Sequence, residues 1–328
     1  MLGRFRCAGG AGVGVSTEDA RVVYEPKRIL VVVKTYPNPS QAHGETVCCA
    51  GVDLETGRWV RMYPITFRRL ADNRFRKYQV IECQATKPRN DARPESLRVD
   101  QDSIKLVGQV IPSSDRWRRR MAMLPAPSGS LEEIKAANVA NDISIGMFRP
   151  KAIRRLVKEH ADPWTEKERA ALRQERLGLG EEETRELSEL EQIPWKFSYE
   201  FDCDAAECGG HKLQIFDWEL GQSYRRWSRS DPTRWEEMIR QKYERELPAR
   251  DLHLVVGTLA AHPKTFVIIG LVYPSRSQMD GAYIQQTLDL VGQEGAVAGE
   301  RIGLEAQEAD ALAGDERDEA MELFPDEG

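Results

Sequence analysis

Short apolar runs separated by turn signals are the feature that most constrains the fold of this chain. Residues 29–33, 45–53, 58–65 and 78–86 each have the length of one strand, and residues 96–111 offer another strand or two. About five strands within the first hundred residues, at this spacing, favour a small barrel or sandwich over alternating βαβ units. A partly open five-stranded barrel is one natural solution.

The rest of the chain mixes helices with two strong strands. A helix is expected after Ser130, whose hydroxyl can cap its first turn, and a second helix is expected from Pro150 to His160. Residues 231–247 carry apolar side chains at helical spacing, and residues 252–273 predict a hairpin. The predicted fold class is therefore α+β and β-rich, with two small barrel-like modules and a helical insertion.

Composition changes along the chain predict its division. Residues 275–328 contain 14 acidic and 3 basic residues, so the rest of the chain is mildly basic although the net charge is −6. The expected parts are a disordered extension (1–26), a first β-barrel-like module (27–112), a linker with a charged helical insertion (113–193), a second α+β module with a Cys/His turn (194–275) and an acidic disordered tail (276–328).

Several protein classes are disfavoured by the sequence. No window holds the roughly 18 consecutive apolar residues of a membrane helix, and the N-terminus lacks the apolar core of a secretory signal. We therefore expect a cytoplasmic protein with no membrane partner, whose six cysteines are reduced. Phosphate-loop, dinucleotide-binding, zincin and serine-esterase motifs do not occur.

Cys203, Cys208 and His211 form the densest group of potential metal ligands. Thiolate and imidazole donors on a turn that contains Gly209 and Gly210 suit a tetrahedral structural zinc ion. The local sequence contains no fourth ligand for such an ion. The candidates for this ligand elsewhere in the chain are His253, His262, Asp217 and Cys83. The alternative is a pair of reduced thiols beside a surface histidine.

Asp217 and Glu219 are the candidate catalytic residues, together with His211. In the segment IFDWEL they stand two residues apart, so on a strand both carboxylates would lie on one face. Such a pair could hold Mg²⁺ for phosphodiester cleavage. The alternative is an ordinary exposed strand face, or salt bridges to Arg225 and Arg226.

Aromatic and basic residues interleave in the first module. Aromatic rings can stack on bases while guanidinium groups contact phosphates. The predicted nucleic-acid-binding residues are Tyr36, Arg58, Trp59, Arg61, Tyr63, Arg68 and Arg69. A half-buried barrel strand produces the same interleaving, with the aromatic side chains in the core.

Five segments together resemble one protein family. They read KTYPNPS, ETVCCAGVDLETGRWVRMYPI, FRRLADNRFRKYQVI, CDAAECGGHKLQIFDWEL and DLHLVVGTLAAHPKTFVIIGLVYP. This pattern resembles the dual OB-containing domain family of uncharacterised bacterial proteins, over residues 27–275. The resemblance implies paired oligonucleotide-binding (OB) barrels and an association with anti-phage defence systems. It supplies no established catalytic residues to carry over to this sequence.

Three functions remain open at this point. The first is a nucleic-acid or nucleotide-binding sensor or adaptor, within an anti-phage defence module. The second is a metal-dependent nuclease that uses His211, Asp217 and Glu219. The third is a protein–protein interaction scaffold whose charged helix, residues 163–192, binds a partner.

Overall fold

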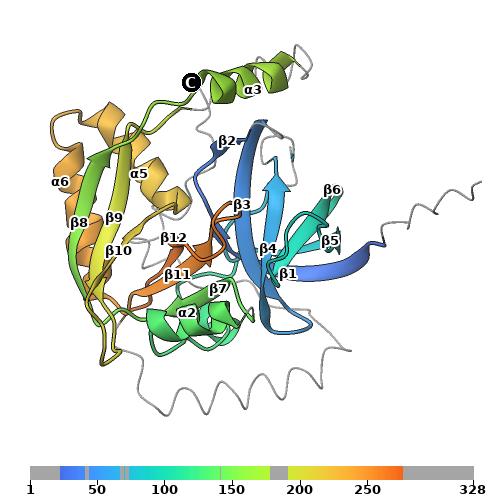
Figure 1. Cartoon of the computed structure of the whole chain (residues 1–328), viewed down its shortest axis with the longest axis horizontal. Coiled ribbons are helices and arrows are strands. Elements are labelled where there is room, and N and C mark those ends of the chain that lie inside the picture. The colour runs from blue at the N-terminus through green and yellow to red at the C-terminus, as the bar shows by residue number, and fades with distance from the viewer. Residues whose placement is uncertain are drawn as a thin grey trace, which may run out of the picture.

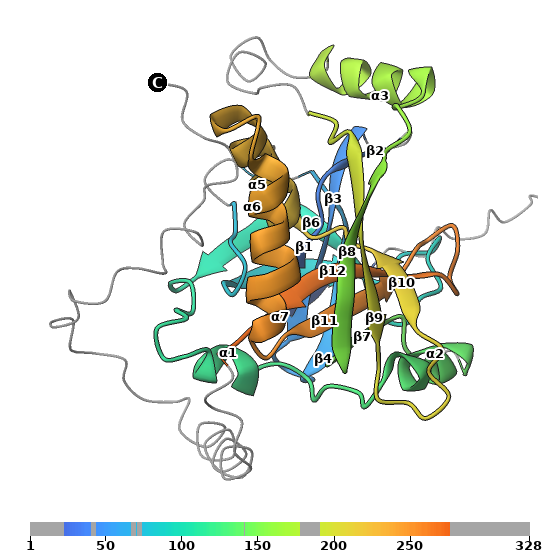
Figure 2. The ribbon, with the colours of Figure 1, turned by 90° about the vertical axis from the view of Figure 1, so that its left-hand side faces the viewer.

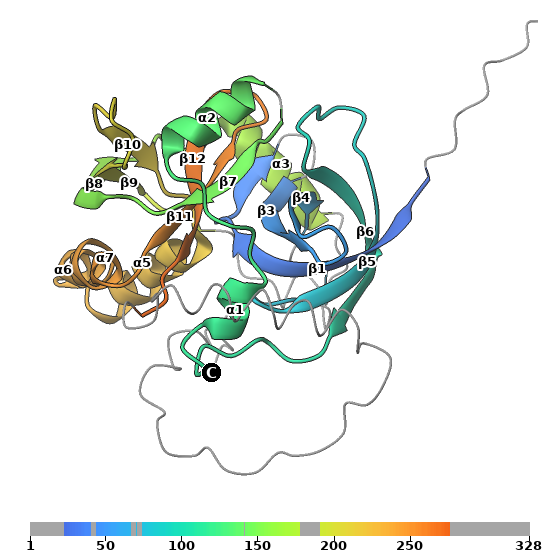
Figure 3. The same cartoon turned by 90° about the horizontal axis from the view of Figure 1, so that it is seen from below.

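Two β-rich modules lie side by side in the computed structural model of this protein (Figures 1 and 3). The structure describes residues 23–40, 44–66, 70, 74–140, 142–177 and 191–275. The strands of the first module are β1 (Glu25–Lys34), β2 (Asn38–Ser40), β3 (Gly44–Asp53), β4 (Arg58–Ile65), β5 (Val80–Thr86) and β6 (Ser96–Val107). The expected hairpin of residues 45–65 is confirmed as β3 and β4.

Five of these strands close into a ring. The order is β1–β5–β6–β4–β3, and β3 pairs back onto β1; β4 and β6 are parallel, and the other pairs are antiparallel. A register shift between Val31 and Val33 bends β1, which allows one strand to pair along both edges. Alternate residues such as Ile29, Val31 and Met62 fill the ring interior.

The second module contains two smaller sheets. Its elements are α2 (Leu131–Val139), β7 (Ile145–Phe148), β8 (Ala152–His160), α3 (Glu166–Leu177), β9 (Trp195–Asp202), β10 (His211–Gln214), α5 (Trp218–Ser230), α6 (Trp235–Arg240), the π-helical turn η2 (Gln241–Glu246), α7 (Leu247–Ala249), β11 (His253–Thr258) and β12 (Phe266–Val272). One sheet has the order β10–β9–β8 and the other β12–β11–β7. The helices α5, α6 and α7 stand beside the sheet of β8 and β9 (Figure 2).

Two local predictions were wrong. The helix expected from Pro150 to His160 is strand β8, because its backbone pairs with β9 over its whole length. The strand expected at IFDWEL ends early: Asp217 is the N-cap of helix α5, and its side chain accepts a hydrogen bond from the Glu219 amide. In both cases a short amphipathic segment is compatible with helix and strand, and tertiary pairing decides.

Other parts of the sequence interpretation are confirmed or lie beyond the described residues. Ser130 caps α2 by accepting a hydrogen bond from the Glu133 amide, and β11 and β12 form the expected hairpin. The described helix of the charged insertion, α3, lies against β2 and β3 of the first module. The expected disordered extension (apart from residues 23–26) and the acidic tail fall outside the described residues. Among the described helices, none is long and apolar enough to cross a membrane.

The two modules share one hydrophobic core. Leu30, Val52 and Trp59, on the outer face of the first ring, belong to the same buried cluster as Leu254 of β11 and Ile268 of β12. The backbones approach closely, since a Cβ added at Gly270 would lie 2.7 Å from the Val33 Cγ2 atom. The first ring therefore buries the outer face around Leu30, Val52 and Trp59 by packing against the second module.

Polar contacts between the two modules fix their relative position at this interface. The Glu95 carboxylate accepts hydrogen bonds from the Ser144 amide at 2.6 Å and from the Ser144 hydroxyl at 2.5 Å. Arg61 donates to the Ser144 carbonyl at 3.2 Å, and Arg93 donates to the Thr258 carbonyl at 2.7 Å. A short segment, α1 (Arg118–Ala122), links the modules between β6 and α2.

We predict that Glu95→Ala destabilises the whole protein. The substitution leaves the buried Ser144 amide and hydroxyl without their acceptor, at a cost of about 2–3 kcal/mol. Urea unfolding monitored by tryptophan fluorescence measures this cost. The control is Glu82→Ala, which removes an exposed pair with Arg28 and is expected to change stability by less than about 1 kcal/mol. Equal stabilities of the two variants would contradict the prediction.

Candidate metal centre and buried charge cluster

The structure brings Cys203, Cys208 and His211 together with a fourth residue, Glu132. Cys203 follows β9, Cys208 lies in the turn, and His211 begins β10, while Glu132 lies in the first turn of α2. One ligand atom of each residue lies within 4.8 Å of the other three. These four residues could hold a metal ion.

The separations within this group fit a compact ligand set. The His211 Nε2 atom lies 3.5 Å from the Cys203 sulfur and 3.4 Å from the Cys208 sulfur. Tetrahedral zinc with ordinary Zn–S and Zn–N bonds would place such atoms about 3.6 Å apart. The Cys203 thiol donates a hydrogen bond to the Glu132 carboxylate, and the other Glu132 oxygen lies 2.7 Å from His211 Nε2.

Glu132 is the ligand that sequence reasoning missed. It is 71 residues from Cys203, and no spacing rule links a helix start to a distant hairpin. The proposed sources of a fourth ligand, namely His253, His262, Asp217 and Cys83, do not belong to the group of donors found among the described residues. Only the packing of α2 beside the β9–β10 hairpin identifies Glu132.

The protonation equilibria of the group favour metal binding at two of its donors. Burial lowers the pKa of His211 and so favours the neutral imidazole, which is the form that binds metals. Hydrogen bonds from the backbone amides of Cys203 and Gly210 lower the pKa of Cys208. Burial, together with donation of its thiol hydrogen bond to Glu132, raises the pKa of Cys203 to about 11.

Asp217 and Glu219 lie in a different contact set from His211. The Lys77 ammonium lies 2.7 Å from a Glu219 carboxylate oxygen and 3.6 Å from an Asp217 carboxylate oxygen. The Tyr273 hydroxyl donates to the other Glu219 oxygen at 3.1 Å. The two carboxylates therefore link α5 of the second module to a lysine of the first, and neither belongs to the metal-ligand group.

Burial and charge together set the protonation of this cluster. Burial opposes the charge on Lys77, but the Asp217 and Glu219 carboxylates outweigh it and raise the lysine pKa. Burial raises the pKa of Asp217 to about 6. Burial acts in the same sense on Glu219, but Lys77 outweighs it and lowers the pKa of that carboxyl.

Lys34 is a second buried lysine of the first module. It is 4% exposed and donates a hydrogen bond to the Phe75 carbonyl. Burial lowers the pKa of Lys34 to about 7. Lys34 is the last residue of β1, and the structure keeps its amine inside the protein.

The predicted nucleic-acid-binding residues occupy very different environments. Trp59 and Arg61 are 9% and 3% exposed and face the second module, so neither can contact a base or phosphate in this conformation. Tyr36 stacks on Trp218 with ring centroids 5.5 Å apart, and its hydroxyl donates to the Glu191 carbonyl. Tyr63 is half-buried and Arg58 is exposed. Arg68 and Arg69 lie outside the described residues.

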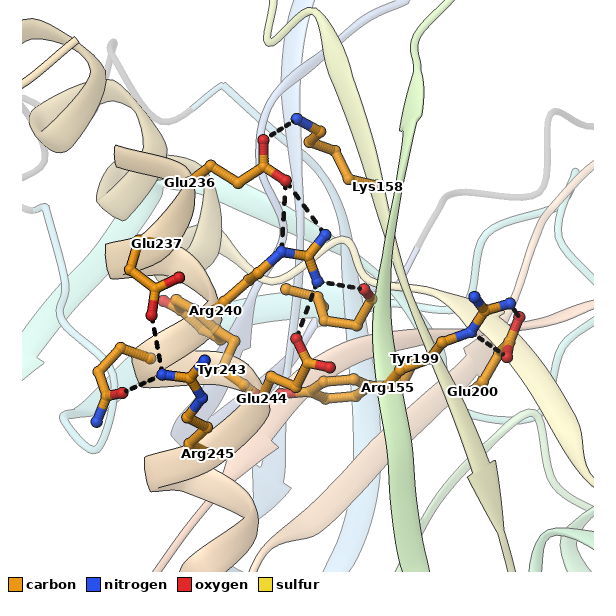
Figure 4. A network of polar contacts seen from close by, with 12 residues as sticks. Arg155, Lys158, Tyr199, Glu200, Glu236, Glu237, Arg240, Tyr243, Glu244 and Arg245 are labelled. Atoms are coloured by element: carbon orange, nitrogen blue, oxygen red, sulfur yellow. Dashed lines mark hydrogen bonds and ion pairs between the residues drawn. The ribbon is translucent and has the colours of Figure 1, made fainter. Parts of the chain in front are cut away.

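A polar network attaches the helices of the second module to its sheet (Figure 4). Arg240 donates to the Leu156 carbonyl of β8 at 3.2 Å and forms ion pairs with Glu236 and Glu244. Glu236 also pairs with Lys158 of β8. Leu156 lies in β8, which is an edge strand of the β10–β9–β8 sheet. The network therefore covers this edge and also holds helix α6 against it.

These observations define a protein of two joined β-rich modules with a candidate metal centre in the second. The comparisons with known families agree with this division. Residues 25–126 match the model of a family described as a domain of unknown function (DUF8758), and residues 127–289 match a second domain of unknown function (DUF8757). The chain therefore carries two such domains in tandem. No curated protein matches it.

We predict that the Lys34→Met variant loses part of the pH dependence of stability. In the folded wild type Lys34 releases its proton near pH 7, whereas in the unfolded chain it does so near 10.5. Between these values the unfolded chain binds more protons, so the free energy of unfolding rises with pH, by up to about 1.4 kcal/mol per pH unit. Lys34→Met is expected to remove this rise.

Urea titrations at pH 6.5, 7.5 and 8.5 measure the effect. The control is Lys105→Met, because Lys105 is exposed on β6. The control is expected to keep the wild-type slope. A Lys34→Met variant whose stability rises with pH as steeply as that of the wild type would refute the assignment.

Proposed function

We propose that this protein binds nucleic acid or a nucleotide, as a sensor or adaptor, through two OB-like modules. The observation that carries the proposal is the strand order of the first ring. Its first strand, β1, pairs with the second and fourth strands of the ring, β3 and β5, and its third and fifth strands, β4 and β6, are parallel. Five-stranded Greek-key barrels of this kind are OB-folds, which bind oligonucleotides over their second and third strands.

The second module repeats this order. The consecutive strands β7 and β8 take the place of the first strand, because β7 pairs with β11 and β8 pairs with β9. Ile215, directly after β10, forms a parallel bridge with Ile268 of β12, which corresponds to the parallel contact of the first ring. Helices α5 to α7 stand between the third and fourth strands. Both modules thus support the same proposal.

The two modules differ in which face is open. The outer face of β3 and β4 in the first ring is covered by the second module, with Trp59 and Arg61 beneath it. The outer face of β8, β9 and β10 is accessible: Arg155, Glu200 and Lys212 form one row across the three strands. The side chains of Arg155 and Lys212 are 62% and 42% exposed. We therefore assign the phosphate contacts to this row and to the adjacent Arg154.

The carboxylates on this face do not prevent such contacts. Arg155 pairs with Glu200 and Lys212 with Glu159, and all four side chains are at least a quarter exposed. Exposed pairs of this kind contribute little to stability, so a phosphate can replace a carboxylate at small cost. In a defence module, the same surface would report the presence of foreign nucleic acid.

The metal centre has a structural role in this proposal. We infer that Glu132, Cys203, Cys208 and His211 hold a zinc ion, because two thiolates and an imidazole are the ligands that structural zinc prefers. The ion would join α2 to the β9–β10 hairpin. Since β9 and β10 carry the open face, the zinc would keep the second and third strands of the module in register.

We predict binding of short single-stranded oligonucleotides that weakens steeply with salt. Fluorescence anisotropy at 50 and 200 mM salt, with DNA and RNA, measures it. The Arg155→Ala/Lys212→Ala double variant is expected to bind more weakly and to reduce the slope of log K against log salt by about 1.4, roughly 0.7 for each phosphate contact on a single strand.

The control for binding is Arg28→Ala in the first ring. Arg28 is equally exposed and equally paired, in this case with Glu82, but it does not lie on the open face. It is expected to bind as the wild type does. Absence of any binding by the wild type at 50 mM salt would refute the proposed function.

We predict one zinc ion per chain in the purified protein. Chelation, or the Glu132→Gln substitution, is expected to lower stability by about 2 kcal/mol or more, which corresponds to a fall in Tm of roughly 4–8 °C. Elemental analysis and thermal unfolding measure the two effects. The control is Glu133→Gln, which changes the same charge on the same turn but lies outside the metal group and keeps an acceptor for the Gly129 amide. Full stability of the metal-free protein would argue against a structural zinc.

A further inference from the structure

The metal group contains two thiols that lie close enough to react with each other. The Cys203 and Cys208 sulfurs each lie about one hydrogen-bond length from the same His211 nitrogen, and within 4.8 Å of one another. The Cys203 amide donates to the Cys208 sulfur at 3.3 Å, so the backbone already folds one cysteine over the other.

The two thiols differ in accessibility in the way that a reacting pair requires. Cys208 is half-buried in the turn and can meet a small oxidant from solvent, whereas Cys203 is only 2% exposed. Cys49 and Cys83 lie inside the first ring, among its buried aliphatic side chains. An oxidant small enough to enter the turn therefore reaches Cys208 before it reaches either of these.

We propose that Cys203 and Cys208 are an oxidisable thiol pair, and that a peroxide joins them in a disulfide which expels the metal ion from the site. The second half of this statement rests on the zinc site of the proposed function. The first half depends only on the two cysteines.

The reaction balances with hydrogen peroxide as the oxidant. The Cys208 sulfur attacks one peroxide oxygen, the O–O bond breaks, one water leaves, and Cys208 becomes a sulfenic acid. The Cys203 sulfur then attacks the Cys208 sulfur, the S–O bond breaks, and the second oxygen leaves as water. The two thiols lose two electrons and two protons, and the peroxide takes up both to form two water molecules.

Disulfide formation removes half of the metal ligands at once. A disulfide sulfur is not a thiolate, so only Glu132 and His211 would remain, too few for a structural zinc site. Loss of the ion removes the metal link between α2 and the β9–β10 hairpin, which carries the open face. The oxidation state of the pair would therefore control the surface to which we assign ligand binding.

The test treats the zinc-loaded full-length protein with hydrogen peroxide. A chromogenic zinc indicator follows release of the ion, and peptide mass spectrometry identifies the disulfide. We expect one Cys203–Cys208 disulfide for each zinc released, and recovery of both thiols with a reductant and added zinc. Cys208→Ser is expected to form no such disulfide, whereas Cys48→Ser, which alters a half-buried cysteine of the first ring, is expected to react as the wild type does.

Two further outcomes separate this inference from the zinc assignment. If the purified protein holds no metal, the zinc site fails, and disulfide formation in the same sample still decides whether the thiols are a pair. Chelator-stripped protein is expected to form the disulfide faster than the loaded protein. Oxidation of Cys208 to sulfinic acid without a link to Cys203, in the loaded and in the stripped protein, would overturn the proposal.

Discussion

The packing of the first ring against the second module is the constraint on which the rest of the structure depends. A five-stranded ring of this size buries its interior with one face of each strand, but the outer face of β1, β3 and β4 is also apolar, with Leu30, Val52 and Trp59. An exposed patch of this kind is costly in water, so the ring requires a partner surface. Strands β11 and β12 of the same chain supply it, and the two modules become one hydrophobic unit.

Polar groups buried by this packing must be satisfied across the interface. Arg61 and Glu95 of the first module meet Ser144 of the second, and Lys77 meets Glu219. Removing one partner of a buried pair costs more than the pair contributes, because the remaining charge stays desolvated. These contacts therefore select one relative position of the modules. The same packing covers the outer face of β3 and β4 in the first ring. The accessible strand face is therefore that of β8, β9 and β10 in the second module.

The metal-ligand group joins two parts of the second module that are far apart in the sequence. Three of its members come from one hairpin, and Glu132 comes from α2, which is the first element of the second module. An ion at this point would tie the start of the module to its second and third strands. A change of state at the two thiols would thus act on the open face directly, without passing through the interface with the first ring.

The sequence by itself determined the local elements and the local chemistry. Short apolar runs and turn signals identified the strands of the first ring, Ser130 identified the start of α2, and the glycine turn predicted the grouping of Cys203, Cys208 and His211, because these depend on neighbours in the chain. Only the tertiary structure decided which residues are accessible and which are paired: the burial of Trp59 and Arg61, the strand conformation of β8 and the contact of Glu132 with the cysteine turn. Each of these depends on contacts between residues tens of positions apart, on which local pattern carries no information.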